Sequence, residues 1–183
     1  MLVADAQRAT RTAYRGGLAG QLVSAAVWAA SAACGTWGSH TLAMIVLVFG
    51  GFFIFPLTVL SLRLGGVRAP AGPRNPLDSL AIQVAFTVPL ALPVVLTLAH
   101  FAPGLFFPAV LLIVGAHYLP FVFLYGMPQW FGLGGAMLAG GYVLGWVRPM
   151  GFAAGGWFGA AVLAVFAFVG WRTVVAEERR SAS

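Results

Sequence analysis

The sequence predicts an all-α integral membrane protein, a bundle of six transmembrane helices, on three observations. Of 183 residues, 61% are hydrophobic and only 8% are charged, and the mean hydropathy is +0.94. Soluble domains carry about 25% charged residues, so a chain this apolar could not cover its core with polar surface in water. Six apolar runs follow one another with short connections, and arginines gather at the ends of these runs. We expect a single transmembrane domain over residues 1–183, surrounded by the lipid bilayer.

Each apolar run is long enough to cross a membrane. A helix rises about 1.5 Å per residue, so a span needs about 20 apolar residues. The longest connection, 63–76, contains three prolines and three arginines and is typical of a stiff, solvated loop. The expected spans lie near residues 18–34, 41–62, 77–99, 105–125, 130–147 and 152–171.

The first span has a second interpretation. The run of arginines, the apolar stretch and the sequence Ala-Ser-Ala-Ala-Cys over residues 30–34 are similar to a cleaved signal peptide. Against cleavage, Gln21 and Ser24 interrupt the apolar stretch, and Ser31 stands where a bulky aliphatic residue is preferred. We therefore expect this helix to remain in the protein.

The arginines predict the orientation of the bundle. With six spans, the clusters fall on one side, which the positive-inside rule assigns to the cytoplasm. Only Arg148 falls outside them. We expect a multi-pass protein of the bacterial inner membrane with both termini in the cytoplasm, and no nucleic-acid partner. The clustered arginines are Arg8, Arg11 and Arg15, then Arg63, Arg68 and Arg74, then Arg172, Arg179 and Arg180. Tryptophans that fit the interfacial belt are Trp37, Trp130, Trp146 and Trp171.

The scarcity of acids and thiols excludes several classes of chemistry. The acids are Asp5, Asp78, Glu177 and Glu178, and Cys34 is the single cysteine. These cannot supply an acidic Mg²⁺ site, a multi-cysteine metal site or paired intramembrane carboxylates. The sequence also contains no phosphate-binding loop, H-E-x-x-H or G-x-S-x-G motif. We therefore expect no metal and no cofactor.

His117 is the first candidate for a functional residue. An ionisable side chain at membrane depth is expensive and is by default a candidate site. Pro120 lacks an N–H group and should free the carbonyl of Ala116. In the alternative interpretation, neutral His117 is a core residue whose ring donates a hydrogen bond to a neighbouring helix. Tyr118, in the same motif, is a further candidate.

Polar residues of three spans share one depth. Counted from the arginine-rich ends of their helices, Gln21 and Ser24 lie roughly 6–10 Å deep, Gln83 roughly 9 Å and His117 roughly 12 Å. A shared depth predicts a polar pocket open to the cytoplasm. The alternative is that each residue only joins neighbouring helices.

Asp78 and the glycines have structural and functional interpretations. Asn75 and Pro76 favour a helix start, and Asp78 then complements the helix dipole in the first turn. Its functional alternative is coupling to protons or cations. Gly151, Gly155 and Gly159 allow close helix approach, either within the chain or in a homo-oligomer.

Two motifs resemble a known family. The first is Asn75-Pro76-Leu77 with Gln83 following, and the second is Gly115-Ala116-His117-x-Leu119-Pro120-Phe121 with Leu124-Tyr125. Together they resemble a family of small bacterial polytopic membrane proteins of unknown function. The resemblance implies a multi-pass fold over most of the chain and no particular activity.

The leading functional prediction is binding or transport of a small apolar or amphipathic solute through the polar pocket. One alternative is an intramembrane enzyme that uses His117 as an acid–base group. Another is a structural or accessory membrane subunit. An enzyme needs a second reactive group beside His117, whereas a subunit needs neither that group nor a polar pocket.

Overall fold

The computed structural model describes residues 2–67 and 75–181, in which all regular structure is helical. Six of its segments are long and apolar enough to cross a membrane, which confirms the predicted six-helix membrane fold. These segments are Arg15–Trp37, His40–Leu64, Asp78–Phe101, Pro103–Tyr125, Gln129–Val147 and Ala154–Glu177. In order, the elements are α1 (Val3–Ala13), η1 (Arg15–Gly17), α2 (Leu18–Trp37), α3 (His40–Leu64), α4 (Asp78–Phe101), η2 (Pro103–Leu105), α5 (Phe106–Tyr118), α6 (Phe121–Tyr125), α7 (Gln129–Tyr142), η3 (Val143–Val147) and α8 (Ala154–Ser181).

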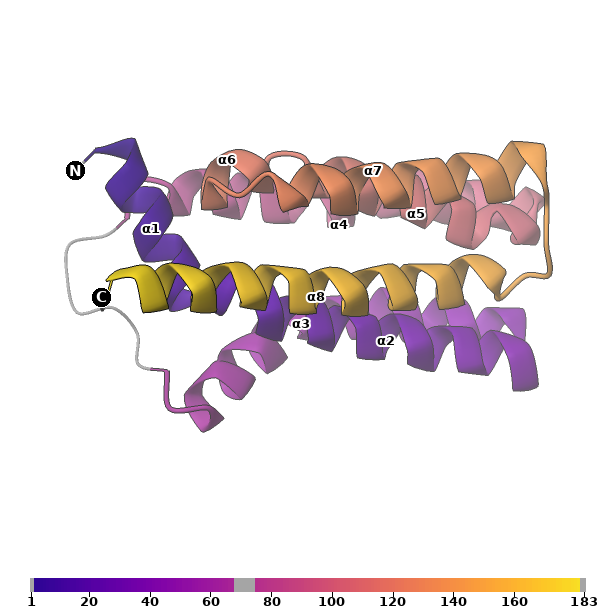
Figure 1. Cartoon of the computed structure of the whole chain (residues 1–183). Helices are drawn as coiled ribbons and strands as arrows, with labels where there is room; N and C mark the ends of the chain where they lie inside the picture. Colours follow the sequence, from indigo (N-terminus) through magenta and orange to yellow (C-terminus); the bar gives the residue numbers. More distant parts are fainter. Residues whose placement is uncertain (1, 68–74, 182–183) are drawn as a thin grey trace.

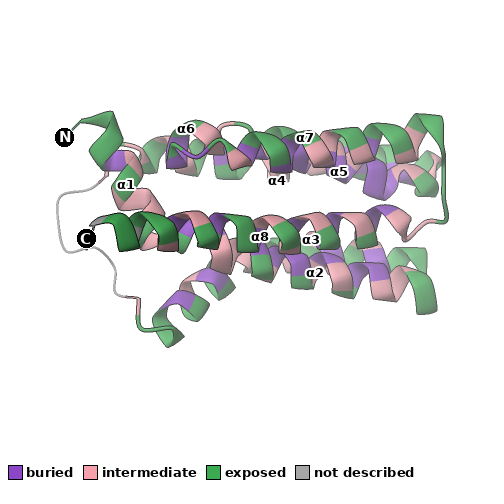
Figure 2. Ribbon diagram, in the orientation of Figure 1, coloured by how far each residue is buried: buried purple, intermediate pink, exposed green. Residues whose placement is uncertain are grey.

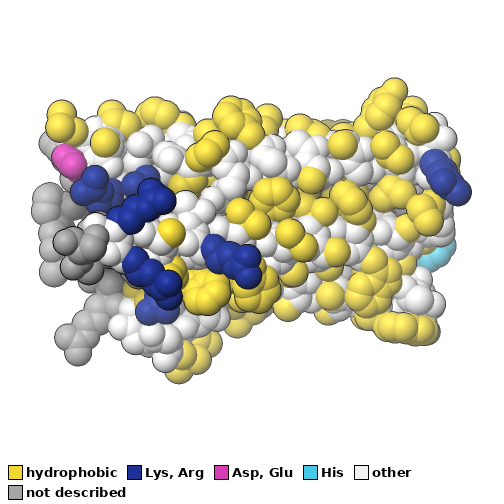
Figure 3. All heavy atoms as spheres, in the orientation of Figure 1, with side chains coloured by type: hydrophobic (Ala, Val, Ile, Leu, Met, Phe, Trp, Pro, Cys, Tyr) yellow, Lys and Arg dark blue, Asp and Glu magenta, His cyan; other side chains and the backbone are white. Residues whose placement is uncertain are grey.

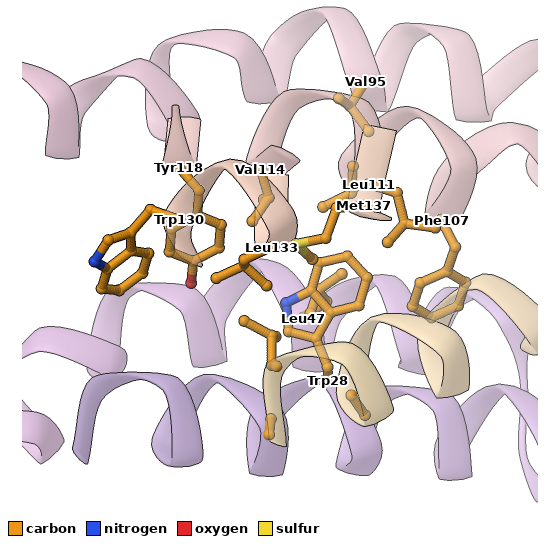
Figure 4. Packing of buried hydrophobic residues seen from close by; sticks show 14 of the residues in the cluster. Trp28, Leu47, Val95, Phe107, Leu111, Val114, Tyr118, Trp130, Leu133 and Met137 are labelled. Carbon is orange, nitrogen blue, oxygen red and sulfur yellow. The ribbon is translucent and has the colours of Figure 1, made fainter. Parts of the chain in front are cut away.

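The helices form two layers (Figure 1). In one layer α2 packs along both α3 and α8, and in the other α5 packs along α7 and more lightly along α4. Contacts of α8 with α7 and α5 join the two layers. Between them lies a core of large apolar side chains, including Trp28, Phe107 and Met137 (Figure 4). Helices α3 and α4 are the most exposed, as expected for helices that face lipid (Figure 2).

Glycines of α8 allow its close contact with α5 of the other layer and with α2 of its own. A Cβ atom on Gly155 would lie 2.7 Å from Cβ of Phe107, and one on Gly159 would overlap the ring of Trp28. These two glycines therefore pack inside the chain. For Gly151 the prediction of close helix approach was wrong. This residue precedes α8, and a Cβ atom there would meet nothing within 4 Å.

The fourth span is divided at Pro120. Helix α5 ends at Tyr118, a turn covers Leu119 and Pro120, and α6 continues to Tyr125. The carbonyl of Ala116, which Pro120 cannot pair with, accepts a hydrogen bond from the N–H of Leu119 at 3.2 Å. Proline thus tightens the chain locally instead of leaving a free acceptor.

Both termini lie at one end of the bundle, which we call the arginine-rich end (Figure 1). Basic side chains gather on the surface there (Figure 3). Arg68 and Arg74 lie outside the described residues. The sequence interpretation missed α1 at this end, because its few apolar residues are interrupted by polar and charged ones. In the structure Ala6 is fully buried, so α1 is part of the fold.

Candidate functional site

Helix α1 closes the arginine-rich end over α6. Gln7 Nε2 donates to the carbonyl of Phe123 at 2.6 Å, and Arg11 Nη1 donates to that of Tyr125 at 2.6 Å. The last carbonyls of a helix have no partner within it, so α1 supplies the donors that α6 lacks. Arg11 Nε also forms an ion pair with Glu177 of α8, with an N–O distance of 3.2 Å.

Asn75 attaches α1 to the start of α4. Its Oδ1 accepts from the N–H of Leu77 at 2.9 Å, which closes a turn directly before α4. Its Nδ2 donates to the carbonyl of Ala6 at 2.9 Å and to Oγ1 of Thr10 at 3.0 Å. Asp78 begins α4 and lies in its first turn. The position of Asp78 fits its structural interpretation.

A left-handed turn joins α1 to α2. Arg15, Gly16 and Gly17 have φ angles of 46°, 65° and 90°. A Cβ atom on Gly16 would lie 2.8 Å from the carbonyl oxygen of Gly170, and one on Gly17 would lie 2.7 Å from Cζ2 of Trp130. Glycine is required at both positions, because it alone fits both the backbone angle and the space. The turn brings the start of α2 against α7 and α8.

Directly behind this turn lies a buried polar group that we call the Gln21 site. Its members come from α2, α5 and α7: Gln21, Ser24, Tyr118, Gln129 and Trp130.

Gln21 is the centre of the site. Its side chain is 2% exposed, and neither atom of its amide has a hydrogen-bond partner among the described residues. Nε1 of Trp130, which is 1% exposed, also has no partner there. The Cβ position on Gly17 is close to both side chains, 3.6 Å from Gln21 Nε2 and 2.7 Å from the Trp130 ring. Donors and an acceptor thus remain unused in one small region.

Tyr118 and Ser24 form the wall of the site beside Gln21. The Tyr118 hydroxyl interacts with the Ser24 side chain, and both residues are buried. The Tyr118 ring stacks on Trp130 with centroids 5.5 Å apart (Figure 4). Phe121 and Tyr125 each lie 5.0 Å from Trp130 by the same measure. The site therefore has a polar centre and an aromatic wall.

Gln129 adds a further unused donor. Its Oε1 accepts from Oγ1 of Thr173 at 3.2 Å, while its buried Nε2 has no partner among the described residues. A Cβ atom on Gly170 would lie 2.7 Å from that Nε2 and 2.8 Å from the carbonyl oxygen of Gly16. The Gln129 amide thus lies against the same glycine turn as Gln21.

His117 touches the Gln21 site through the ring of Tyr118, with centroids 5.4 Å apart, but its hydrogen bonds are with α4. Its Nδ1 is 2.9 Å from the carbonyl oxygen of Val84 and 3.1 Å from Oγ1 of Thr87. A carbonyl can only accept, so this contact requires a proton on Nδ1. The Thr87 hydroxyl donates to the same carbonyl at 2.7 Å. These contacts join α4 to α5, which is the arrangement expected if His117 is a core residue.

Gln83 is exposed on the outer face of α4 and makes no hydrogen bond within the described residues. The structure therefore brings Gln21, Ser24 and Tyr118 together, whereas His117 is hydrogen-bonded to α4 and Gln83 is exposed. Equal depth does not fix how each helix is rotated about its own axis. Sequence reasoning missed Gln129 and assigned Trp130 to the membrane interface, although its ring is buried.

A model for a family of unknown function, DUF7010, matches residues 3–173. The chain belongs to this family. No curated protein and no solved structure matches it. The DUF7010 match begins at the first residue of α1 and ends at Thr173, so it includes α1, all members of the Gln21 site and most of α8.

The surface of this DUF7010 protein has two hollows at the arginine-rich end. One of about 480 Å³ runs along the end of α8 beside Trp171 and Arg172, and one of about 230 Å³ lies between α2 and α3. No member of the Gln21 site lines either hollow. Within residues 2–67 and 75–181, no three His, Cys, Asp or Glu side chains gather as metal ligands. The members of the Gln21 site carry no formal charge, and all of them are buried except Gln129, which is half-buried.

Proposed function

We propose that this DUF7010 protein binds and transports a small amphipathic solute, whose polar group docks at the Gln21 site. The observation that carries the proposal is the Gln21 amide, which is 2% exposed with both polar atoms unpaired among the described residues. More than about 90% of buried polar groups in proteins have a partner. Each unpaired one costs about 1–3 kcal/mol, so a ligand that pairs with Gln21 would recover that free energy.

The chemistry of the site defines the solute. The unpaired donors are Nε2 of Gln21, Nε2 of Gln129 and Nε1 of Trp130, and the unpaired acceptor is Oε1 of Gln21. A neutral group that both accepts and donates, such as an amide or a hydroxyl, would pair with them. A charged group would have no counter-ion among the side chains of the Gln21 site. The aromatic wall at Tyr118 and Trp130 suits the apolar part of the solute.

Access to the site requires α1 to move. Helix α1 is held mainly by hydrogen bonds from Gln7, Arg11 and Asn75, and by one ion pair whose Glu177 side chain is 49% exposed. Exposed ion pairs contribute about 1 kcal/mol or less. Release of α1 and of the glycine turn would open the Gln21 site toward the arginine-rich end, which we assign to the cytoplasm.

The orientation is tested with reporters fused after Ser183. We expect a fluorescent cytoplasmic reporter to be active and a phosphatase reporter, which needs the periplasm, to be inactive. The opposite result would place the arginine-rich end outside the cell and remove a cytoplasmic entrance.

The binding role is tested with Gln21→Leu, and Gln83→Leu, at an exposed position on α4, is the matched control. If Gln21 serves a ligand, Gln21→Leu should raise the melting temperature of the empty protein, because it removes an unpaired buried amide. Native mass spectrometry should then show a small molecule co-purifying with the parent and with Gln83→Leu but not with Gln21→Leu. A lower melting temperature for Gln21→Leu, with no bound molecule in any form, would assign Gln21 a structural role.

The arrangement around His117 does not favour the enzyme alternative. Its contacts within the described residues are with Val84, Thr87 and the rings of Tyr118 and Phe121, none of which is a carboxylate or thiol. An acid–base enzyme would require a reactive partner there.

A further inference from the structure

The groove between α2 and α3 at the arginine-rich end is separate from the Gln21 site. It has a volume of about 230 Å³. The end of α3 turns away from the bundle on this side (Figure 1). The walls of the groove are mainly aliphatic, and its lining residues are Arg15, Leu18, Ala19, Leu22, Val23, Ser61, Leu62, Gly65 and Val67.

Among the described residues that line the groove, Arg15 is the single charged one. Its side chain is exposed, and it forms no ion pair or hydrogen bond with any described residue. Its backbone is left-handed, with φ at 46°, which glycine would adopt without strain. Strained non-glycine residues are concentrated at functional sites, so the position is informative. Arg15 thus adds an exposed, unpaired positive charge to a groove that is otherwise mainly aliphatic.

We propose that this groove binds one anionic phospholipid of the surrounding bilayer. The phosphate would pair with the guanidinium of Arg15, and one acyl chain would lie against Leu18, Leu22 and the end of α3. Arginine is well suited to the phosphate because its planar group donates two parallel hydrogen bonds. Arg15 begins the first span and Leu64 ends the second, so the groove lies at the ends of both spans, where a bilayer would place its headgroups. We therefore take the bilayer itself as the source of this ligand.

The charge and the apolar wall together distinguish this site from general attraction of arginines to anionic lipid. Ser61 is the polar side chain among the groove residues, and its hydroxyl already donates to the carbonyl of Leu57 at 2.8 Å. Binding of the lipid phosphate therefore depends on Arg15, whereas binding of the acyl chain depends on the shape of the groove.

The test compares how much dioleoyl phosphatidylglycerol and dioleoyl phosphatidylcholine raise the melting temperature of the purified full chain in detergent. We expect a larger rise with the anionic lipid, and no rise with glycerol 3-phosphate, which is an anionic phosphate without acyl chains. In Arg15→Gly, glycine suits the backbone angle, so the lipid-free protein should melt no lower than the parent. The affinity for phosphatidylglycerol should nevertheless fall about tenfold or more, as expected for loss of a charged hydrogen bond.

Further variants separate the role of the Arg15 charge from the role of the shape of the groove. Arg148→Gly removes one exposed arginine at the opposite end and should keep the preference for phosphatidylglycerol. Ala19→Phe fills the groove with the charge intact and should abolish the preference, and Leu22→Trp repeats this test at a more exposed position. The proposal is wrong if Arg15→Gly keeps the preference, if both groove-filling variants keep it, or if the two lipids act equally on the parent. Stabilisation by glycerol 3-phosphate alone would assign Arg15 to free phosphates instead.

Discussion

The guanidinium of Arg11 donates a 2.6 Å hydrogen bond to the main-chain carbonyl of Tyr125, so the amphipathic N-terminal helix completes the end of α6. Arg11→Met removes this bond and the ion pair with Glu177, and we expect the free energy that holds α1 in place to fall by about 1–3 kcal/mol. Hydrogen exchange of residues 3–13 should become faster. Arg8→Met is the control, because Arg8 is exposed on the same helix and should leave exchange unchanged.

Asn75 allows the turn before α4 and the attachment of α1 to be separated. Asn75→Asp keeps the acceptor for the N–H of Leu77 but loses the donor to Ala6 and Thr10, whereas Asn75→Ala loses both. We expect both variants to loosen α1, and only Asn75→Ala to loosen the start of α4 as well, by about 1 kcal/mol for the lost hydrogen bond. Hydrogen exchange measured separately in α1 and in the first turn of α4 tests this difference.

Asn75→Asp also tests whether α1 controls entry to the Gln21 site. In Cys34→Ser protein, a cysteine in place of Ser24 should react slowly with a water-soluble thiol reagent, because Ser24 is 5% exposed. Adding Asn75→Asp should increase the rate. Equal rates with and without Asn75→Asp would show that α1 does not control access.

Gly17 should be among the least replaceable residues. Gly17→Ala meets the Trp130 ring at 2.7 Å and has an unfavourable φ of 90°, so it should lower the free energy of unfolding by about 3 kcal/mol. Gly66 has a φ of 75° with nothing within 4 Å of its Cβ position. Gly66→Ala should therefore cost only the backbone strain, about 1 kcal/mol. Equal losses in unfolding experiments would mean that the Trp130 contact is unimportant.

Because of Tyr14, we expect the folded protein to lose stability at alkaline pH. Burial, and then the charge of Asp78, raise the pKa of the Tyr14 phenol above its usual value of about 10. Below that pH the phenol is protonated in both folded and unfolded chains and adds no pH dependence. Above it, the unfolded chain releases its proton first, so stability falls as pH rises toward the folded pKa. Tyr14→Phe should show a smaller fall in melting temperature between pH 9 and 11, whereas Tyr142→Phe, at an exposed position, should match the parent.

The sequence predicted the spans well because a membrane helix depends on the apolar character of about 20 consecutive residues. Boundaries were less certain where helices extend beyond the bilayer. Helix α8 continues to Ser181, past the predicted end at residue 171, and Val174 there packs against Gly16. Helix α1 escaped notice because its main contacts are hydrogen bonds to distant main-chain carbonyls.

The candidate site was only partly predictable for a different reason. Gln21, Ser24 and Tyr118 were recognised as polar residues in apolar spans, and they do meet. Gln83 has the same polarity and depth as Gln21 but faces outward, because helix rotation is set by packing and not by composition. Trp130 has the position of an interfacial ring, and its burial follows from the close approach of Gly17, which the order of residues alone does not reveal.

The packing of α2 against α8 has a consequence for biogenesis. The first membrane span finds one of its two main neighbours only when the last span has been made. Until then the face of Trp28 that meets Gly159 in the finished bundle has no partner from α8, although its ring can already pack on Phe107 of α5. Insertion can thus proceed helix by helix, but closure of the bundle is deferred to the end of translation. A chain interrupted before α8 would lack the contribution of Ala160, Leu163 and Val174 to the core, and α2 would lack one of its two main neighbours.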